Sequence, residues 1–124
     1  MAFTTYVTST TTQGTFTISN TDSYTTDQVT KIQESVATGT ADQEISLAID
    51  ISKLKAFSMQ ASQAMTVKTN SSGAPQETFT LTAGTPVIFV TGDTAIFAGD
   101  VTKLFITNAS GSLATFNIIA AIDN

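Results

Sequence analysis

Two ten-residue stretches of the chain resemble each other: DISKLKAFSM at 50–59 and DVTKLFITNA at 100–109. Each starts with Asp, a β-branched apolar residue, a hydroxyl residue, Lys and Leu, and then continues as an alternating apolar segment. An Asp two residues before Ser or Thr favours an Asx-turn, in which its carboxylate accepts a hydrogen bond from the chain just ahead. We therefore interpret each stretch as a corner where the chain passes from one sheet to the next, with Leu54 and Leu104 in the core.

The repeated phrase also predicts the architecture around it. A hairpin is expected after each copy, through QASQ at 60–63 and NASGS at 108–112. A two-fold pseudo-repeat of this kind suits a jelly roll, which is two Greek keys wound together, whereas chance similarity over five positions is the alternative. The residues to which we assign this architectural role are Asp50, Lys53, Leu54, Phe57, Asn70, Asp100, Lys103, Leu104 and Asn108.

The rest of the chain reads as short strands separated by Gly-, Pro- and Asn-containing turns. Thr makes up roughly a fifth of the residues, and Thr, Val, Ile and Phe fit a pleated sheet. The sequence therefore predicts an all-β fold: a single antiparallel β-sandwich, jelly-roll-like, with about 8–10 short strands. The expected strands include FTTYVTS from position 3, GTFTIS from 14, EISLAIDI from 44, KAFSMQA from 55, MTVKTN from 65, ETFTLTA from 77, PVIFVT from 86, KLFITNA from 103 and LATFNIIAAI from 113.

One segment leaves helix and strand open, and another predicts its own place in the sheet. The apolar residues of DQVTKIQESV at 27–36 fall at helical spacing, but its Thr and Ser content favours a strand. PVIFVT at 86–91 is apolar on both faces, which is typical of a central strand.

Composition removes most catalytic chemistry. The chain has no Cys and no His, and its five basic residues are all Lys, so Ser–His and Cys–His pairs, thiolate metal sites and Arg clamps are excluded. Paired carboxylates are the catalytic option that remains, but most acidic residues fall in expected turns. We expect no enzyme activity, no cofactor and no metal.

Net charge is −5, which repels a nucleic-acid backbone and an anionic membrane surface, so neither is an expected partner. Asp93 and Asp100 flank the loop TGDTAIFAGD and offer oxygen ligands for calcium, but no EF-hand spacing is present and we interpret them as turn residues. Asn70 and Asn108 match the N-glycosylation pattern, and each is explained as the end of a strand before a Ser/Gly-rich turn.

Residues 1–24 form a Thr-rich arm that belongs to the same domain as the sandwich body, residues 25–124. The start of the arm has no basic region and no apolar run, so we expect no secretory signal and a protein that stays in the cytoplasm or in a particle assembled there. The arm is expected either to add an edge strand to its own sandwich or to lie against a neighbouring subunit. Its candidate partner-binding residues are Phe3, Tyr6, Val7, Phe16 and Tyr24.

Residues 44–123 resemble a group of small virion proteins of tailed bacteriophages. The matching features are Asp50, Lys53, Leu54 and Phe57, then TVKTN at 66–70, SSGAP at 71–75 and DVTKLFITNASG at 100–111. The resemblance implies a capsid-associated β-sandwich, a cement or decoration protein that binds the major capsid protein of the virion as a homo-oligomer, with a trimer favoured. Many proteins of that group carry Trp after AGTP, whereas this chain has VIFVTGDTAIF.

Two other functions compete with capsid cementing. A carbohydrate-binding or adhesin module on a phage tail or surface structure requires an aromatic face, which a chain with no Trp and two Tyr supplies poorly. A hydrolase requires a carboxylate pair across a cleft.

Overall fold

The computed structural model describes residues 3–13, 15–26 and 28–123. Within the first two strands it describes the side chains of Thr4, Tyr6, Val7 and Thr26, and the backbone of the other residues. The described part of the chain forms ten strands and no helix. The strands are β1 (Phe3–Gln13), β2 (Phe16–Thr26), β3 (Gln28–Val36), β4 (Thr40–Ile49), β5 (Leu54–Ala61), β6 (Met65–Thr69), β7 (Thr78–Leu81), β8 (Val87–Val90), β9 (Val101–Asn108) and β10 (Ala114–Ile122).

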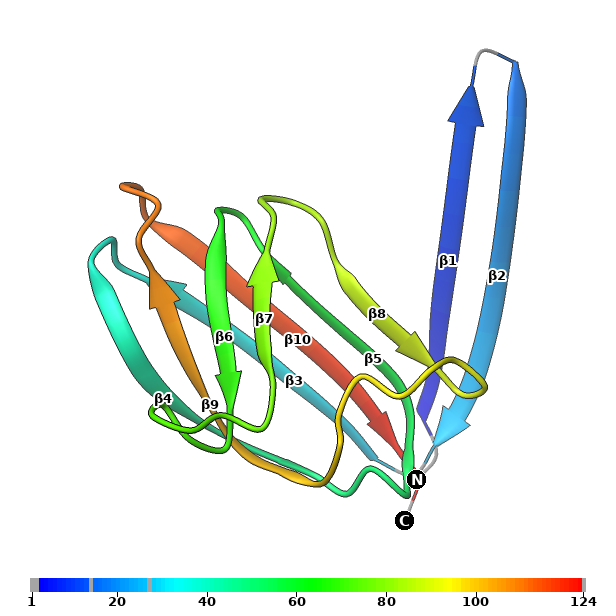
Figure 1. Cartoon of the computed structure of the whole chain (residues 1–124). Helices are drawn as coiled ribbons and strands as arrows, with labels where there is room; N and C mark the ends of the chain where they lie inside the picture. The colour runs from blue at the N-terminus through cyan, green and yellow to red at the C-terminus, as the bar shows by residue number, and fades with distance from the viewer. Residues whose placement is uncertain (1–2, 14, 27, 124) are drawn as a thin grey trace.

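The body is a sandwich of two four-stranded sheets, ordered β3-β10-β5-β8 and β4-β9-β6-β7 (Figure 1). All pairings are antiparallel, and they join the two halves of the body in reverse order: β6 with β7, β5 with β8, β4 with β9 and β3 with β10. The body is therefore a long hairpin that bends at β6–β7 and folds over itself, which is a jelly roll. The predicted antiparallel sandwich of jelly-roll type is confirmed.

Alternating residues of both sheets meet between the layers and form the core. Phe97, in the loop before β9, joins the layers because its ring packs edge-on against Phe57 of one sheet, with centroids 5.2 Å apart, and against Phe79 of the other, at 5.8 Å. Residues that are almost fully buried include Leu47, Ile49, Phe57, Met59, Val67, Leu104, Ile106, Phe116 and Ile118.

Both copies of the repeated phrase lie where the chain changes sheets. Asp50 follows β4 and leads into β5 of the other sheet, and Asp100 precedes β9 after the chain has left β8. Leu54 and Leu104 are buried in the core, as predicted. Each copy is followed by a unit of two strands, β5 and β6 after the first and β9 and β10 after the second. The two units lie side by side, because β5 pairs with β10 and β6 with β9.

The hairpin expected after each copy is wrong. β5 and β6 belong to different sheets, and so do β9 and β10, so each connection crosses the sandwich instead of closing a hydrogen-bonded pair. The physical reason is that both strands of each unit are apolar on the face toward the core, and two such strands bury that face by lying opposite each other.

The structure settles the other open choices. The segment with helical spacing forms the strand β3, as favoured from its Thr and Ser content. PVIFVT gives β8, an edge strand and not a central one. The arm does not extend either sheet of the sandwich: β1 and β2 form a two-stranded sheet of their own, so the first of the two alternatives for the arm, an edge strand, is wrong. The two arm segments pair over eleven positions, from Phe3↔Thr26 to Gln13↔Phe16, so each satisfies the backbone groups that face the other strand.

Candidate interaction surface

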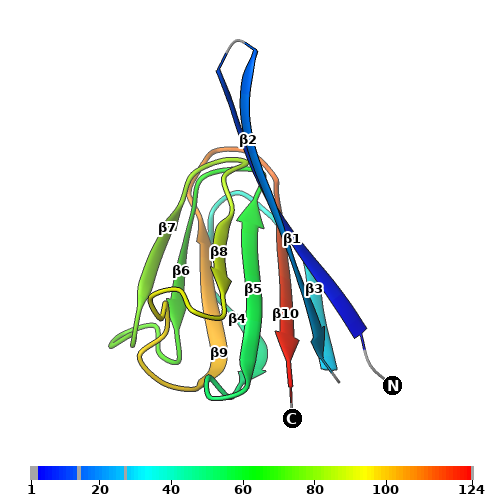
Figure 2. The same cartoon turned by 90° about the vertical axis from the view of Figure 1, so that its right-hand side faces the viewer.

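The β1–β2 hairpin projects from one side of the sandwich, and the end of β1 and the start of β2 stand clear of the body (Figures 1 and 2). Asp22 is the one charged residue in the sequence between Phe3 and Thr26. An isolated two-stranded hairpin is marginally stable in water at best. The hairpin therefore depends on whatever surface covers it.

The five candidate partner-binding residues lie on this hairpin, Phe3, Tyr6 and Val7 on β1 and Phe16 and Tyr24 on β2. The Tyr6 side chain is 69% exposed, and Val7 is partly buried. The side chains of Phe3, Phe16 and Tyr24 lie outside the described part of the structure. The role of these five residues in binding a partner stays a prediction.

The end of the hairpin where β1 begins and β2 ends, here called the hairpin root, covers part of the outer face of the β3-β10-β5-β8 sheet (Figure 2). Ala56 on β5 pairs with Ala121 on β10, and both alternate with core-facing neighbours, so both point outward. They are nevertheless buried, with 2% and 0% exposure, and β2 contacts both β5 and β10. The hairpin root therefore packs on the row of residues that includes this Ala pair.

The next row on the same outer face is open to solvent and carries two apolar side chains, beside the exposed Lys31 of β3. Ile119 on β10, Ser58 on β5 and Ile88 on β8 stand in register, and the two Ile side chains remain 42% and 38% exposed. Together with Tyr6 and Val7 of the hairpin, they line a groove of about 220 Å³. This apolar groove explains why the edge strand β8 is apolar on both faces: Val87 and Phe89 pack against the core, and Ile88 lines the groove.

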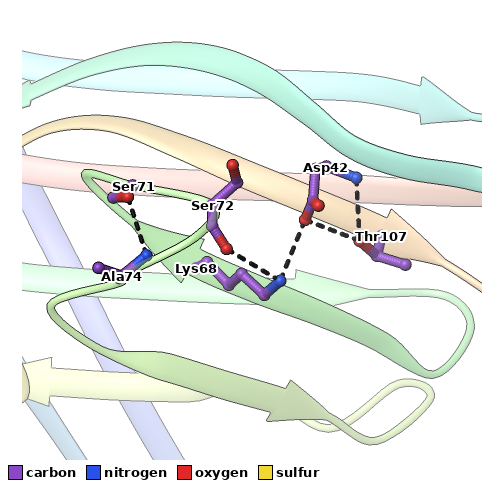
Figure 3. Close-up of polar contacts among 6 residues, drawn as sticks. All are labelled: Asp42, Lys68, Ser71, Ser72, Ala74 and Thr107. Carbon is purple, nitrogen blue, oxygen red and sulfur yellow. Dashed lines mark hydrogen bonds and ion pairs between the residues drawn. The ribbon is translucent and has the colours of Figure 1, made fainter.

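The outer face of the opposite sheet is polar. Figure 3 shows Lys68 of β6 donating to the Asp42 carboxylate of β4 at 3.3 Å and to the Ser72 carbonyl at 3.2 Å. The backbone N–H of Asp42 donates to the Thr107 hydroxyl, which in turn donates to the Asp42 carboxylate (Figure 3). Lys103 and Glu44 form a further ion pair at 3.4 Å. The two outer faces of the sandwich therefore differ: one is solvated by ions and hydroxyls, and the other presents the apolar groove.

The turn residues of the repeated phrase are held in two different ways. Asp50 makes the predicted Asx-turn, since its carboxylate accepts from the backbone N–H of Ser52 at 3.0 Å and from its hydroxyl at 2.6 Å. These hydrogen bonds hold the pKa of Asp50 below its usual value, and Lys53, 3.8 Å away, lowers it further. The expected Asx-turn at Asp100 is wrong: its carboxylate accepts from the backbone N–H of Ile51 and so ties one copy of the phrase to the other.

An Asx-turn at Asp100 would use the backbone N–H of Thr102, but this N–H donates to Asn70 instead. Its side-chain oxygen accepts from the backbone N–H of Thr102 at 2.8 Å, and its amide nitrogen donates to the Asp100 carbonyl at 2.9 Å. Asn70 has a φ of 67°, a left-handed conformation that Asn tolerates better than most residues. Its role is to join the end of β6 to the start of β9.

Asn108 is fully buried at the end of β9. Its amide donates to the carbonyls of Val36 and Ser112, and its oxygen accepts from the backbone and hydroxyl of Ser110. The interpretation of Asn70 and Asn108 as turn residues therefore agrees with their contacts, and the buried Asn108 offers no accessible amide for a glycan.

The described residues contain no group of three or more acidic, His or Cys side chains placed to hold a metal ion. Asp93 and Asp100 each accept a hydrogen bond from a backbone N–H, of Val90 and Ile51 respectively. Within the described chain, no helix is long and apolar enough to cross a membrane.

No family model matches the chain, and no curated protein matches it. Among solved structures, it is similar to a protein from Bacillus endospore appendages, described as a novel family of disulfide-linked pili, at 15% identity and a TM-score of 0.36. The match covers 77% of this chain and 89% of the other. A likeness this distant carries no argument about function.

Proposed function

We propose that the protein is a non-catalytic structural subunit that adheres to a larger assembly through its hairpin and the apolar groove beside it. The observation that carries this proposal is the difference between the two outer faces of the sandwich. One is covered with ion pairs and Thr side chains, whereas the other exposes Tyr6, Ile88 and Ile119. Clustered apolar side chains on a small soluble domain mark interaction surfaces.

The assembly that we propose is the capsid shell of a tailed bacteriophage, with the protein as a cement or decoration subunit of the virion. The support is the resemblance of residues 44–123 to small phage virion proteins. A jelly roll whose turns are held by the buried Asn108 and by the side chains of Asp50 and Asn70 suits a part that needs stability and adhesion but no reactive group. In this proposal the major capsid protein is the shell partner, and repetition by symmetry compensates for weak single contacts.

A carbohydrate-binding role has less support, because Tyr6 is the one strongly exposed aromatic side chain among the described residues. A glycan array tests this alternative directly.

The cementing proposal is tested on phage heads that contain the protein. Heads stripped of it are compared with untreated heads and with stripped heads to which purified protein is added back. We expect stripped heads to release DNA at a lower temperature and re-addition to restore the original value. Equal heat resistance of all three preparations would show that the protein does not cement the shell.

A further inference from the structure

The groove on the outer face of the β3-β10-β5-β8 sheet is only partly filled by its own hairpin. Tyr6 and Val7 line the groove from the hairpin side, while Ile88 and Ile119 line it from the sheet and remain about two-fifths exposed. Its other lining residues are Ala56, Phe57 and Ser58, so no charged side chain lines the groove itself; the exposed Lys31 of β3 stands next to it, paired with Ile119. An uncharged, open apolar groove favours an occupant that is itself uncharged.

The β1–β2 hairpin, in turn, is only partly covered by the sandwich. Its root contacts β5 and β10, but its far end stands beyond the sandwich and receives no support from the body (Figures 1 and 2). Beyond the root, the two strands of 11 residues each, with Asp22 as their one charged residue, lack the layer that stabilises a sheet in water. A second surface is required to cover it.

One molecule therefore carries both a hairpin that is uncovered beyond its root and a groove that its own hairpin only partly fills. The groove is also continuous with the contact that the hairpin root already makes at Ala56 and Ala121. We infer that the groove receives the β1–β2 hairpin of a second copy of this chain. This inference rests on the proposed adhesive function and gives the self-association a defined site.

The contact joins two different surfaces, a hairpin on one copy and a groove on the other. Contacts of this head-to-tail kind close into rings when the rotation between copies permits, and otherwise they continue as open chains. A ring satisfies every hairpin and every groove at once. The trimer expected from the sequence resemblance is one such ring.

The occupant is identified by photo-crosslinking of the full chain. The photoreactive amino acid p-benzoylphenylalanine replaces Ile88 in one preparation and Leu113 in a control. Leu113 is 66% exposed but lies outside the groove residues. Each protein is made with ¹⁴N and with ¹⁵N, mixed and irradiated, because mixed-isotope crosslinks arise only between copies. We expect such crosslinks from position 88 to peptides of residues 3–26, and none to those peptides from position 113.

A matched set of substitutions tests the same contact without a probe. Ile88→Asp and Ile119→Asp place a charge at positions that are already partly solvated, so each variant is expected to fold. Each weakens self-association at least about tenfold, because the carboxylate loses water when a hairpin covers it. Leu113→Asp leaves association unchanged. Sedimentation equilibrium measures the association, and Ile88→Thr, which keeps the preference for a strand, shows an intermediate loss.

The inference is overturned if crosslinks from position 88 are confined to same-isotope pairs, or if mixed-isotope crosslinks lead to segments other than the hairpin. It is also overturned if the Asp variants associate as strongly as the unaltered chain. These measurements use the free protein, so they are independent of the head-stability assay: a failure to self-associate leaves cementing to be judged by that assay, and the reverse also holds.

Discussion

Replacing Asn108 with Ala removes the polar anchor at one end of the sandwich. Its side chain makes four hydrogen bonds of 2.7–3.1 Å: two donated to the Val36 and Ser112 carbonyls, and two accepted from Ser110. Each is worth about 0.5–1.5 kcal/mol net, and a buried group left without its partner costs more. Val36 is buried, whereas Ser110 and Ser112 are exposed and regain water. We therefore expect a loss of about 2–4 kcal/mol in the free energy of unfolding.

The assay is equilibrium unfolding in urea. The dependence of the free energy of unfolding on urea concentration is compared between variants, to verify that each exposes the same amount of surface on unfolding. Asn117→Ala, at an exposed position of β10, is the matched control and is expected to change stability by less than about 0.5 kcal/mol. Asn108→Asp is expected to be at least as harmful as Asn108→Ala near neutral pH, because a buried carboxylate then faces two carbonyl oxygens. A loss below about 1 kcal/mol for Asn108→Ala would refute the assignment of Asn108 as a structural anchor.

Three further substitutions test other parts of the fold. Asp50→Asn removes a carboxylate whose pKa is lowered in the folded state. The unaltered chain is therefore expected to be more stable than the variant near neutral pH, and this difference declines as pH falls through the titration range of the carboxylate, below about pH 4. Urea titrations at a series of pH values measure the difference. Phe97→Ala removes the ring that joins the two layers and is expected to cost about 3–5 kcal/mol, against a smaller loss for Phe105→Ala on the outer, partly exposed side of β9; equal losses would contradict the assigned role of Phe97. Gly111→Ala places a side chain at a φ of 86° and is expected to lower the melting temperature, whereas Gly73→Ala, with no left-handed φ and open space around it, is not.

Local patterns in the sequence predicted most of the strands because alternation of apolar residues is a local property. Burial alternates along β6, along the second half of β4 and along residues 104–108 of β9, and Leu54 and Leu104 lie in the core as the repeated phrase predicts. The Asx-turn at Asp50 was equally predictable, because its acceptor and donor are two residues apart.

Features that depend on long-range contacts could not be read in the same way. The Asp100 carboxylate bonds to Ile51, and Asn70 takes the Thr102 N–H, across separations that no local pattern encodes. The sequence of β8 predicts a central strand because both of its faces are apolar, and the apolar groove that accounts for its outer face forms only in the folded molecule. The Ala56–Ala121 pair carries no sequence signal that distinguishes a surface covered by the hairpin from an exposed one.

The most direct test of the adhesive surface is a cryo-electron microscopy map of the protein in its native assembly, at a resolution that separates strands. We predict that the hairpin and the groove at Ile88 and Ile119 lie in contacts with neighbouring molecules, while the face with the Asp42–Lys68 ion pair is turned to solvent. A map in which that polar face makes the contacts, and the hairpin and groove remain open, would contradict the account.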